Sequence, residues 1–195
     1  MVENKVKRIV RQVIPVLLLT GFFNLGAGSL LGGLEEYMAG YLTGTLVMVP
    51  PLMALKGNIT GTLASRLGSG LHQGLIDSGN FLNKEVKTNV YAAISLSVIT
   101  AVAIGTMATL ITIIFTGAAF SLSLLTQLIS VAVIAAALSV ILLSIISVAV
   151  SIISFRKGWD PDNITSPVLT TLGDILSIGS LYVALWVVLN IGGSI

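Results

Sequence analysis

The chain has 195 residues, of which 55% are hydrophobic and only 9% are charged, and its mean hydropathy is +1.02. Because a water-soluble domain needs more polar surface than this, the composition excludes a soluble fold and predicts an all-α integral membrane protein. The net charge of +2 gives no reason to expect nucleic acid as a partner, the lack of cysteine excludes thiolate metal sites, and a single histidine excludes a multi-histidine site within one chain.

Five apolar segments are each long enough to cross a bilayer, which takes about 20 residues. We expect one transmembrane domain over residues 1–195, with helices at about 10–34, 37–76, 89–116, 122–154 and 164–190. The first segment follows basic residues, as the apolar part of a signal peptide does. It exceeds the usual length of about 7 to 15 residues, however, so we interpret it as a retained helix.

Lysine and arginine are unevenly distributed along the chain. All ten lie in the N-terminal tail, in or beside the connection between the second and third segments, or in the connection between the fourth and fifth. Cytoplasmic loops carry an excess of these residues. With five spans, the pattern predicts a cytoplasmic N-terminus and a C-terminus outside.

The second segment contains two adjacent prolines, Pro50 and Pro51, just before Lys56, Gly57 and Asn58. Proline lacks the N–H group that an α-helix needs and frees a backbone carbonyl one turn earlier. We therefore expect a helix break here and another at Pro167 in the fifth segment. In the fourth segment, four serines share one helical face, which we interpret as packing between helices.

The fifth segment carries a carboxylate deep in its apolar run. If the helix begins near Ile164, Asp174 lies roughly 15 Å along it, near the middle of a hydrocarbon core about 30 Å thick. An acid there costs roughly 2.5 to 3.5 kcal/mol and indicates a functional site. On an ideal helix it shares a stripe with Asn163, Pro167 and Thr170, which begins beside Asp160 and Asp162.

This stripe offers only oxygen and amide groups, which suit hard cations such as Mg²⁺ or Ca²⁺. Two other interpretations need no ion. Asp160, Asp162 and Asn163 are also what a helix start requires as caps and as dipole partners. Asp174 itself can be a protonated acid hydrogen-bonded to a neighbouring helix.

Two motifs on the second and fifth segments together resemble a known transporter family. They are Pro51-Leu-Met-Ala-Leu-Lys-Gly-Asn58 with Thr62-Leu-Ala-Ser-Arg-Leu67, and Asp160-Pro-Asp-Asn163 with Pro167 and Leu172-Gly-Asp174. This pair, in this order, is similar to the divalent-cation transporters that include the bacterial MgtE magnesium channels and the animal solute carrier family 41.

The resemblance implies a five-helix unit that works in pairs, with the pore between two units and an aspartate there binding the ion. Asp174 corresponds to that aspartate, Gly57 and Asn58 match the second-helix motif, and Thr170 can offer a carbonyl. Asp160, Asp162 and Asn163 are then secondary cation contacts at the cytoplasmic mouth. A single unit implies a homodimer within the lipid bilayer of the cell membrane.

The chain departs from the family in two ways. Only a dozen residues precede the first helix, so we expect no cytoplasmic magnesium-sensing region to gate it. Lys56 also stands where the channels usually have glycine, which is closer to the family 41 form. The transported ion, Mg²⁺ or else Mn²⁺, Co²⁺ or Ca²⁺, stays open, as do the direction of transport and channel versus coupled exchange.

Two functions from other classes compete with transport. An intramembrane aspartyl hydrolase would use two carboxylates brought together in a dimer, since such a pair shares a proton. The alternative is a non-transporting subunit of a larger membrane complex. We expect a transporter and no enzyme, because no second catalytic motif accompanies Asp174.

Overall fold

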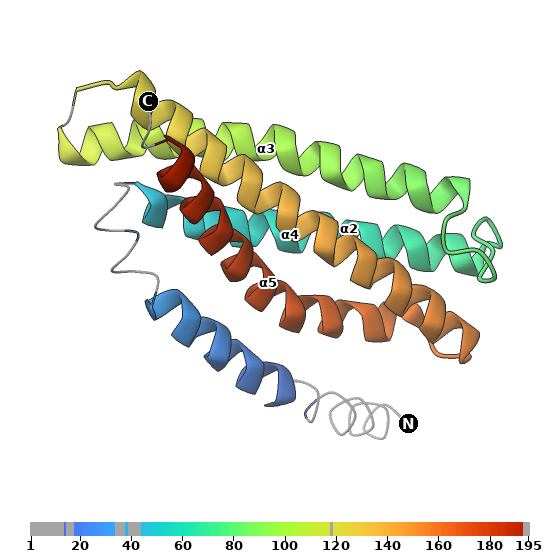
Figure 1. The fold of residues 1–195 in the computed structure, drawn as a ribbon. Coiled ribbons are helices and arrows are strands. Elements are labelled where there is room, and N and C mark those ends of the chain that lie inside the picture. The colour runs from blue at the N-terminus through green and yellow to red at the C-terminus, as the bar shows by residue number, and fades with distance from the viewer. Residues whose placement is uncertain (1–13, 15–17, 34–37, 39–43, 118, 193–195) are drawn as a thin grey trace.

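The computed structural model describes residues 14, 18–33, 38, 44–117 and 119–192, apart from the side chains of residues 162, 163, 191 and 192 (Figure 1). All regular structure within these ranges is helical. The helices are Leu18–Gly33, α2 (Thr45–His72), α3 (Lys84–Thr116), α4 (Leu122–Arg156) and α5 (Pro161–Gly192).

Helices α2 to α5 run up and down beside one another, with α4 at the centre (Figure 1). Helix α4 packs against each of the other three, and α2 also packs against α3 and α5. The contact between α2 and α5 places the two motifs side by side, although α3 and α4 lie between them along the chain.

The core of the bundle is built from small and medium apolar side chains on α2, α3, α4 and α5, joined by Ala27 of the first helix. Many large apolar side chains point outward instead, among them Ile99, Ile114 and Phe115 of α3. Helices that are apolar on the outside as well as the inside belong in a membrane. Helices α3, α4 and the Ile164–Asn190 part of α5 are long and apolar enough to cross one.

The ends of the helices have local causes. Helix α2 begins at Thr45 after Gly44, whose φ of 94° suits only glycine well, and it ends at His72. Helix α3 begins at Lys84, five residues before the expected start, because the Asn83 side chain caps it by accepting a hydrogen bond from the Val86 N–H at 2.9 Å. The expected starts of the first two helices, 10 and 37, lie outside the described residues.

The expected break at Pro50 and Pro51 is corrected by the structure, because α2 is continuous from Thr45 to His72. Both prolines lie in its second turn, where only a few helical hydrogen bonds precede them. Helix α5 is likewise continuous through Pro167, which lies in its second turn. A proline this close to the start of a helix removes fewer intrahelical bonds than one at the centre, so neither helix is interrupted.

The α2–α3 connection and the α4–α5 connection are in contact with each other. The Arg156 Nε–H donates to the Ser78 carbonyl oxygen, and its guanidinium lies 4.9 Å from the centre of the Phe81 ring. His72 and Asp160 form a second link, with 3.7 Å between His72 Nε2 and Asp160 Oδ1. One end of the bundle therefore holds both basic connections.

Candidate functional site

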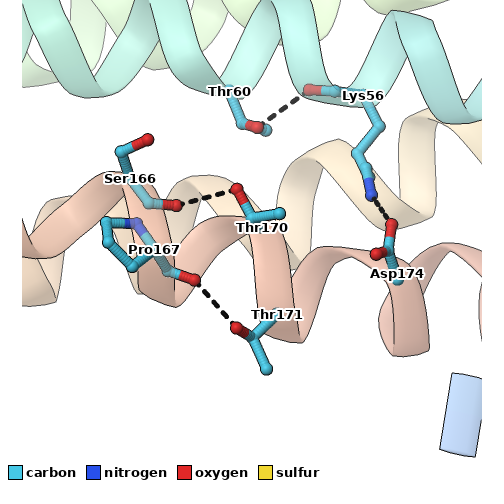
Figure 2. A network of polar contacts seen from close by, with 7 residues as sticks. All are labelled: Lys56, Thr60, Ser166, Pro167, Thr170, Thr171 and Asp174. Atoms are coloured by element: carbon cyan, nitrogen blue, oxygen red, sulfur yellow. Dashed lines mark hydrogen bonds and ion pairs between the residues drawn. The ribbon is translucent and has the colours of Figure 1, made fainter. Parts of the chain in front are cut away.

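Asp174 lies where α5 packs against α2, and its carboxylate forms an ion pair with the ammonium group of Lys56 (Figure 2). Both charges sit within apolar helices, where a lone charge is costly and a paired one much less so. Asp174 is thus bonded to a neighbouring helix, and its partner there is the basic side chain of Lys56.

The two partners differ in exposure. The Lys56 side chain is 7% exposed and the Asp174 side chain is 28% exposed. The lysine is thus buried in the bundle, while part of the Asp174 side chain stays exposed. An ion that reaches Asp174 from outside the bundle would meet the carboxylate before the ammonium.

Gly173 makes room for this arrangement. A methyl group built on its Cα would lie 3.2 Å from Lys56 Nζ and 3.3 Å from Lys56 Cδ. The lysine stem thus lies against the bare backbone of α5 at Gly173. A larger residue at this position would push the ammonium away from Asp174.

A cavity of about 170 Å³ between α2 and α5 adjoins Lys56, and Asp174 is not among its lining residues. Two threonines line it: Thr60 Oγ1 donates to the Lys56 carbonyl at 2.8 Å, and Thr170 Oγ1 donates to the Ser166 carbonyl at 3.0 Å (Figure 2). Each hydroxyl donates its one hydrogen bond to a backbone carbonyl, so the lone pairs of its oxygen are available to bind a cation. The other lining residues are Met53, Lys56, Gly57, Gly61, Ser166 and Leu169.

The structure brings some of the predicted residues to this cavity and separates others from it. Gly57 and Thr170 both line it. Asn58 instead lines a different cavity, between α2 and α3, together with Ala92 and Leu96. Asn58 follows Gly57 by one position, about 100° around α2, and its contact with the metal ion stays a prediction.

The predicted mouth residues lie at the start of α5. Asp160 pairs with His72, and both side chains are about half exposed. It precedes Asp174 by 14 residues, roughly 21 Å along a helix, so the two carboxylates belong to different sites. The side chains of Asp162 and Asn163 lie outside the described residues, and their cation contacts stay a prediction.

Sequence reasoning missed Lys56, Thr60 and Gly173 as members of the site. One signal was available for the lysine: a basic residue in an apolar segment requires a partner of opposite charge, and Asp174 is the acid at similar depth. Nothing in the sequence indicated Thr60 or Gly173, because their roles depend on which faces of α2 and α5 meet.

Within the part of the chain that the structure describes, no three histidine or acidic residues gather in a group that would hold a metal ion. One carboxylate, two hydroxyl oxygens and nearby backbone carbonyls suit a hard cation that keeps several of its waters. The partner of Asp174 is an ammonium group, whereas an aspartyl hydrolase needs a second carboxylate there.

Comparison with known proteins gives two concordant results. The family model MgtE, described as divalent cation transporter, matches residues 49–184, a range that contains both Lys56 and Asp174. Solute carrier family 41 member 2 of Xenopus laevis is 30% identical over 180 residues, which are 87% of this chain and 30% of the relative. Member 3 of Mus musculus is 30% identical over 171 residues, 87% of this chain and 35% of the relative. The chain spans about a third of the length of these relatives.

Proposed function

Because the chain belongs to the MgtE family of divalent cation transporters, we propose that it moves a divalent cation, Mg²⁺ in the first place, across the membrane past Asp174. It is a multi-pass protein of the cell membrane, with helices long and apolar enough to span it. The observation that carries the proposal is the partly exposed Asp174 side chain, paired with Lys56, which itself lines a cavity together with the hydroxyl groups of Thr60 and Thr170. The matched relatives are named solute carriers, which fits transport and gives no support to hydrolysis.

The chemistry of the cavity supports Mg²⁺ as the substrate. Carboxylate and hydroxyl oxygens suit Mg²⁺, Mn²⁺ and Ca²⁺ better than soft metals. Mg²⁺ gives up its waters reluctantly, and a cavity of about 170 Å³ has space for an ion with part of its hydration shell. Co²⁺, which accepts the same ligands, is the next substrate to compare.

We propose a homodimer with the transport path between two copies. One carboxylate is few for a dication, and a two-fold axis near Asp174 would bring a second. Positions on the same side as the cavity are exposed in the single chain, among them Gly57, Gly61 and Thr170. Among the described residues, no atom beyond the local backbone of α2 lies within 4 Å of a methyl group built on Gly57 or Gly61, which leaves space beside α2 for the ion path.

Five spans and a cytoplasmic N-terminus complete the proposal. Helices α2 to α5 form an even number of passes, so the start of α2 and the end of α5 lie at the same end of the bundle (Figure 1). The opposite end carries Lys84, Arg156 and Lys157, which favours the cytoplasm for that end. A first span through Leu18–Gly33 then begins on the cytoplasmic side.

The test is Mg²⁺ uptake by liposomes that contain the purified protein, measured with a trapped fluorescent indicator. Wild type is expected to raise uptake well above protein-free liposomes, and Asp174→Asn is expected to reduce it at least about 100-fold, since an uncharged amide loses most of the attraction for the ion. Light scattering in detergent should give the mass of two copies.

The matched control is Asp77→Asn, which removes an exposed acid in the α2–α3 connection, outside the site. It should leave uptake unchanged. Uptake by Asp174→Asn equal to wild type would show that the ion passes elsewhere, and no uptake by wild type in either direction of the gradient would refute transport of Mg²⁺.

A further inference from the structure

We infer that the Lys56 ammonium acts as a built-in counter-ion of the transport site. It pairs with the Asp174 carboxylate whenever no transported ion is bound there, and it excludes monovalent cations from the carboxylate. A transported ion must take the place of this ammonium group. The inference rests on the proposed function and adds to it a residue that determines specificity. It is carried by the ion pair between α2 and α5 and by the cavity beside it.

A cation can bind Asp174 only if it is attracted to the carboxylate more strongly than the Lys56 ammonium is. Na⁺ or K⁺ carries the same single charge as Lys56 and gains no more Coulomb attraction from Asp174 than it displaces, while giving up water to do so. A dication gains twice the attraction at the same distance. The lysine is also attached, so its local concentration at Asp174 is far above that of an ion in solution.

The structure provides a place for the displaced ammonium. The cavity of about 170 Å³ is lined by the lysine itself and by the Thr60 and Thr170 hydroxyls, whose oxygens can accept an N–H. The lysine has a flexible four-carbon stem. Its backbone is held in place, since Thr60 Oγ1 donates to the Lys56 carbonyl at 2.8 Å. The head group can therefore move while the helix stays still.

Gly173 fits the same interpretation. The lysine stem passes within 3.2 to 3.4 Å of a methyl group built at Gly173. Contact with the α5 backbone aligns the ammonium with the carboxylate but provides no further charge to hold it there. The ion pair can thus form when no transported ion is present. When an ion arrives, the Lys56 ammonium has to leave only one charged partner, the Asp174 carboxylate.

The experiment compares Lys56→Met with Lys56→Arg in the liposome assay. Methionine keeps much of the stem and removes the charge, so the half-saturating Mg²⁺ concentration should fall about tenfold. Na⁺ in excess should inhibit Mg²⁺ uptake by this variant and leave wild type unaffected. Arginine keeps the charge and should preserve the exclusion of Na⁺. Lys84→Met, at the exposed start of α3, is the control for loss of a lysine and should match wild type.

The inference is overturned if Lys56→Met takes up Mg²⁺ with unchanged half-saturation and unchanged resistance to Na⁺. It is also overturned if the folded variant carries no Mg²⁺, because the lysine would then assist the ion and not compete with it. Either result leaves the role of Asp174 intact, since that role is tested by wild type against Asp174→Asn.

A second measurement needs no substitution at Lys56 and so does not depend on the folding of a variant. A small acylating reagent is applied to the wild-type protein with and without Mg²⁺, and modification of each lysine is read by mass spectrometry. Displacement predicts that Mg²⁺ speeds modification of Lys56 several-fold and leaves Lys84 unchanged. An Mg²⁺-independent rate at Lys56, in protein that takes up Mg²⁺, would contradict displacement.

Discussion

Ser147 and Ser151 of α4 show how differently two buried side chains one turn apart can contribute. Both side chains are completely buried, and Ser144 and Ser154 on the same face are at most 3% exposed. The predicted role of this serine face in packing between helices is therefore confirmed. Ser151 Oγ lies 3.2 Å from Thr165 Oγ1 of α5, whereas the Ser147 hydroxyl has no hydrogen-bond partner among the described residues.

This contrast gives a prediction at the scale of one residue. Ser151→Ala removes a hydrogen bond between α4 and α5 and should lower the free energy of unfolding by about 0.6 to 1.7 kcal/mol. Ser147→Ala removes an equal volume and a buried hydroxyl without a partner, so stability should stay the same or rise. Unfolding in mixed micelles, followed by circular dichroism, measures both; equal losses for the two variants would contradict the assignment.

Among single residues, the sequence indicated Asp174 but not its partner. The depth of the acid in an apolar helix follows from counting residues, which needs no structure. The pairing with Lys56 spans 118 positions and depends on how α2 and α5 are rotated about their axes. A pattern on one helix does not fix its rotation against another. For the same reason the sequence did not indicate that Asn58, two residues from Lys56, lines the cavity between α2 and α3.

At the scale of helices, α3 and α4 come into close contact at Gly105. A methyl group built there would lie 2.6 Å from the Ile129 Cα atom and 2.9 Å from its nitrogen. The obstacle is backbone, which has no rotamer by which to give way. The α3–α4 packing therefore requires glycine at this position, as small residues often permit close helix approach in membranes.

Gly105→Ala should separate α3 from α4 and lower the free energy of unfolding by about 1 to 3 kcal/mol, the usual cost of overpacking a close contact. Gly179→Ala is the matched control, because in the described part of the chain no atom beyond the local backbone of α5 lies within 4 Å of its added methyl group. It should be neutral or stabilise α5 by up to about 1 kcal/mol. Thermal unfolding in detergent measures both, and equal stability of Gly105→Ala and wild type would show that the helices can move apart freely.

The sequence predicts a helix reliably where the apolar run is long and uniform, as in α3 and α4. It is less informative for α2, where Pro50 and Pro51 predicted a break that the continuous helix does not have. The sequence shows that a proline lacks an N–H group, but it does not show how many helical hydrogen bonds precede that proline. Because α2 begins at Thr45, Pro50 and Pro51 lie in its second turn and do not interrupt the helix.

At the scale of the whole molecule, the basic residues Arg156 and Lys157 and the turn that begins at Gly117 lie at opposite ends of α4. This helix has 35 residues, about 52 Å at 1.5 Å per residue, which exceeds the bilayer core. The proposed orientation places Lys157 in the cytoplasm and Ala119 outside.

Single cysteines test this orientation without background, since the chain contains none. Ala119→Cys should react with a membrane-impermeant thiol reagent in intact cells, and Lys157→Cys only after the membrane is opened. The measured quantity is the fraction of labelled protein before and after permeabilisation. Reaction of Lys157→Cys in intact cells, with Ala119→Cys protected, would invert the topology; labelling of both would contradict it.

The pair between α2 and α5 also has a consequence for how the protein is made. Lys56 leaves the ribosome 118 residues before Asp174, which at about 5 to 20 residues per second is a wait of roughly 6 to 24 s. During this interval α2 has a lysine and no acid to match it, so its insertion is costly until α5 arrives. The nascent chain must therefore keep α2 close to the insertion machinery or the lipid headgroups, and the last helix completes the integration of the second.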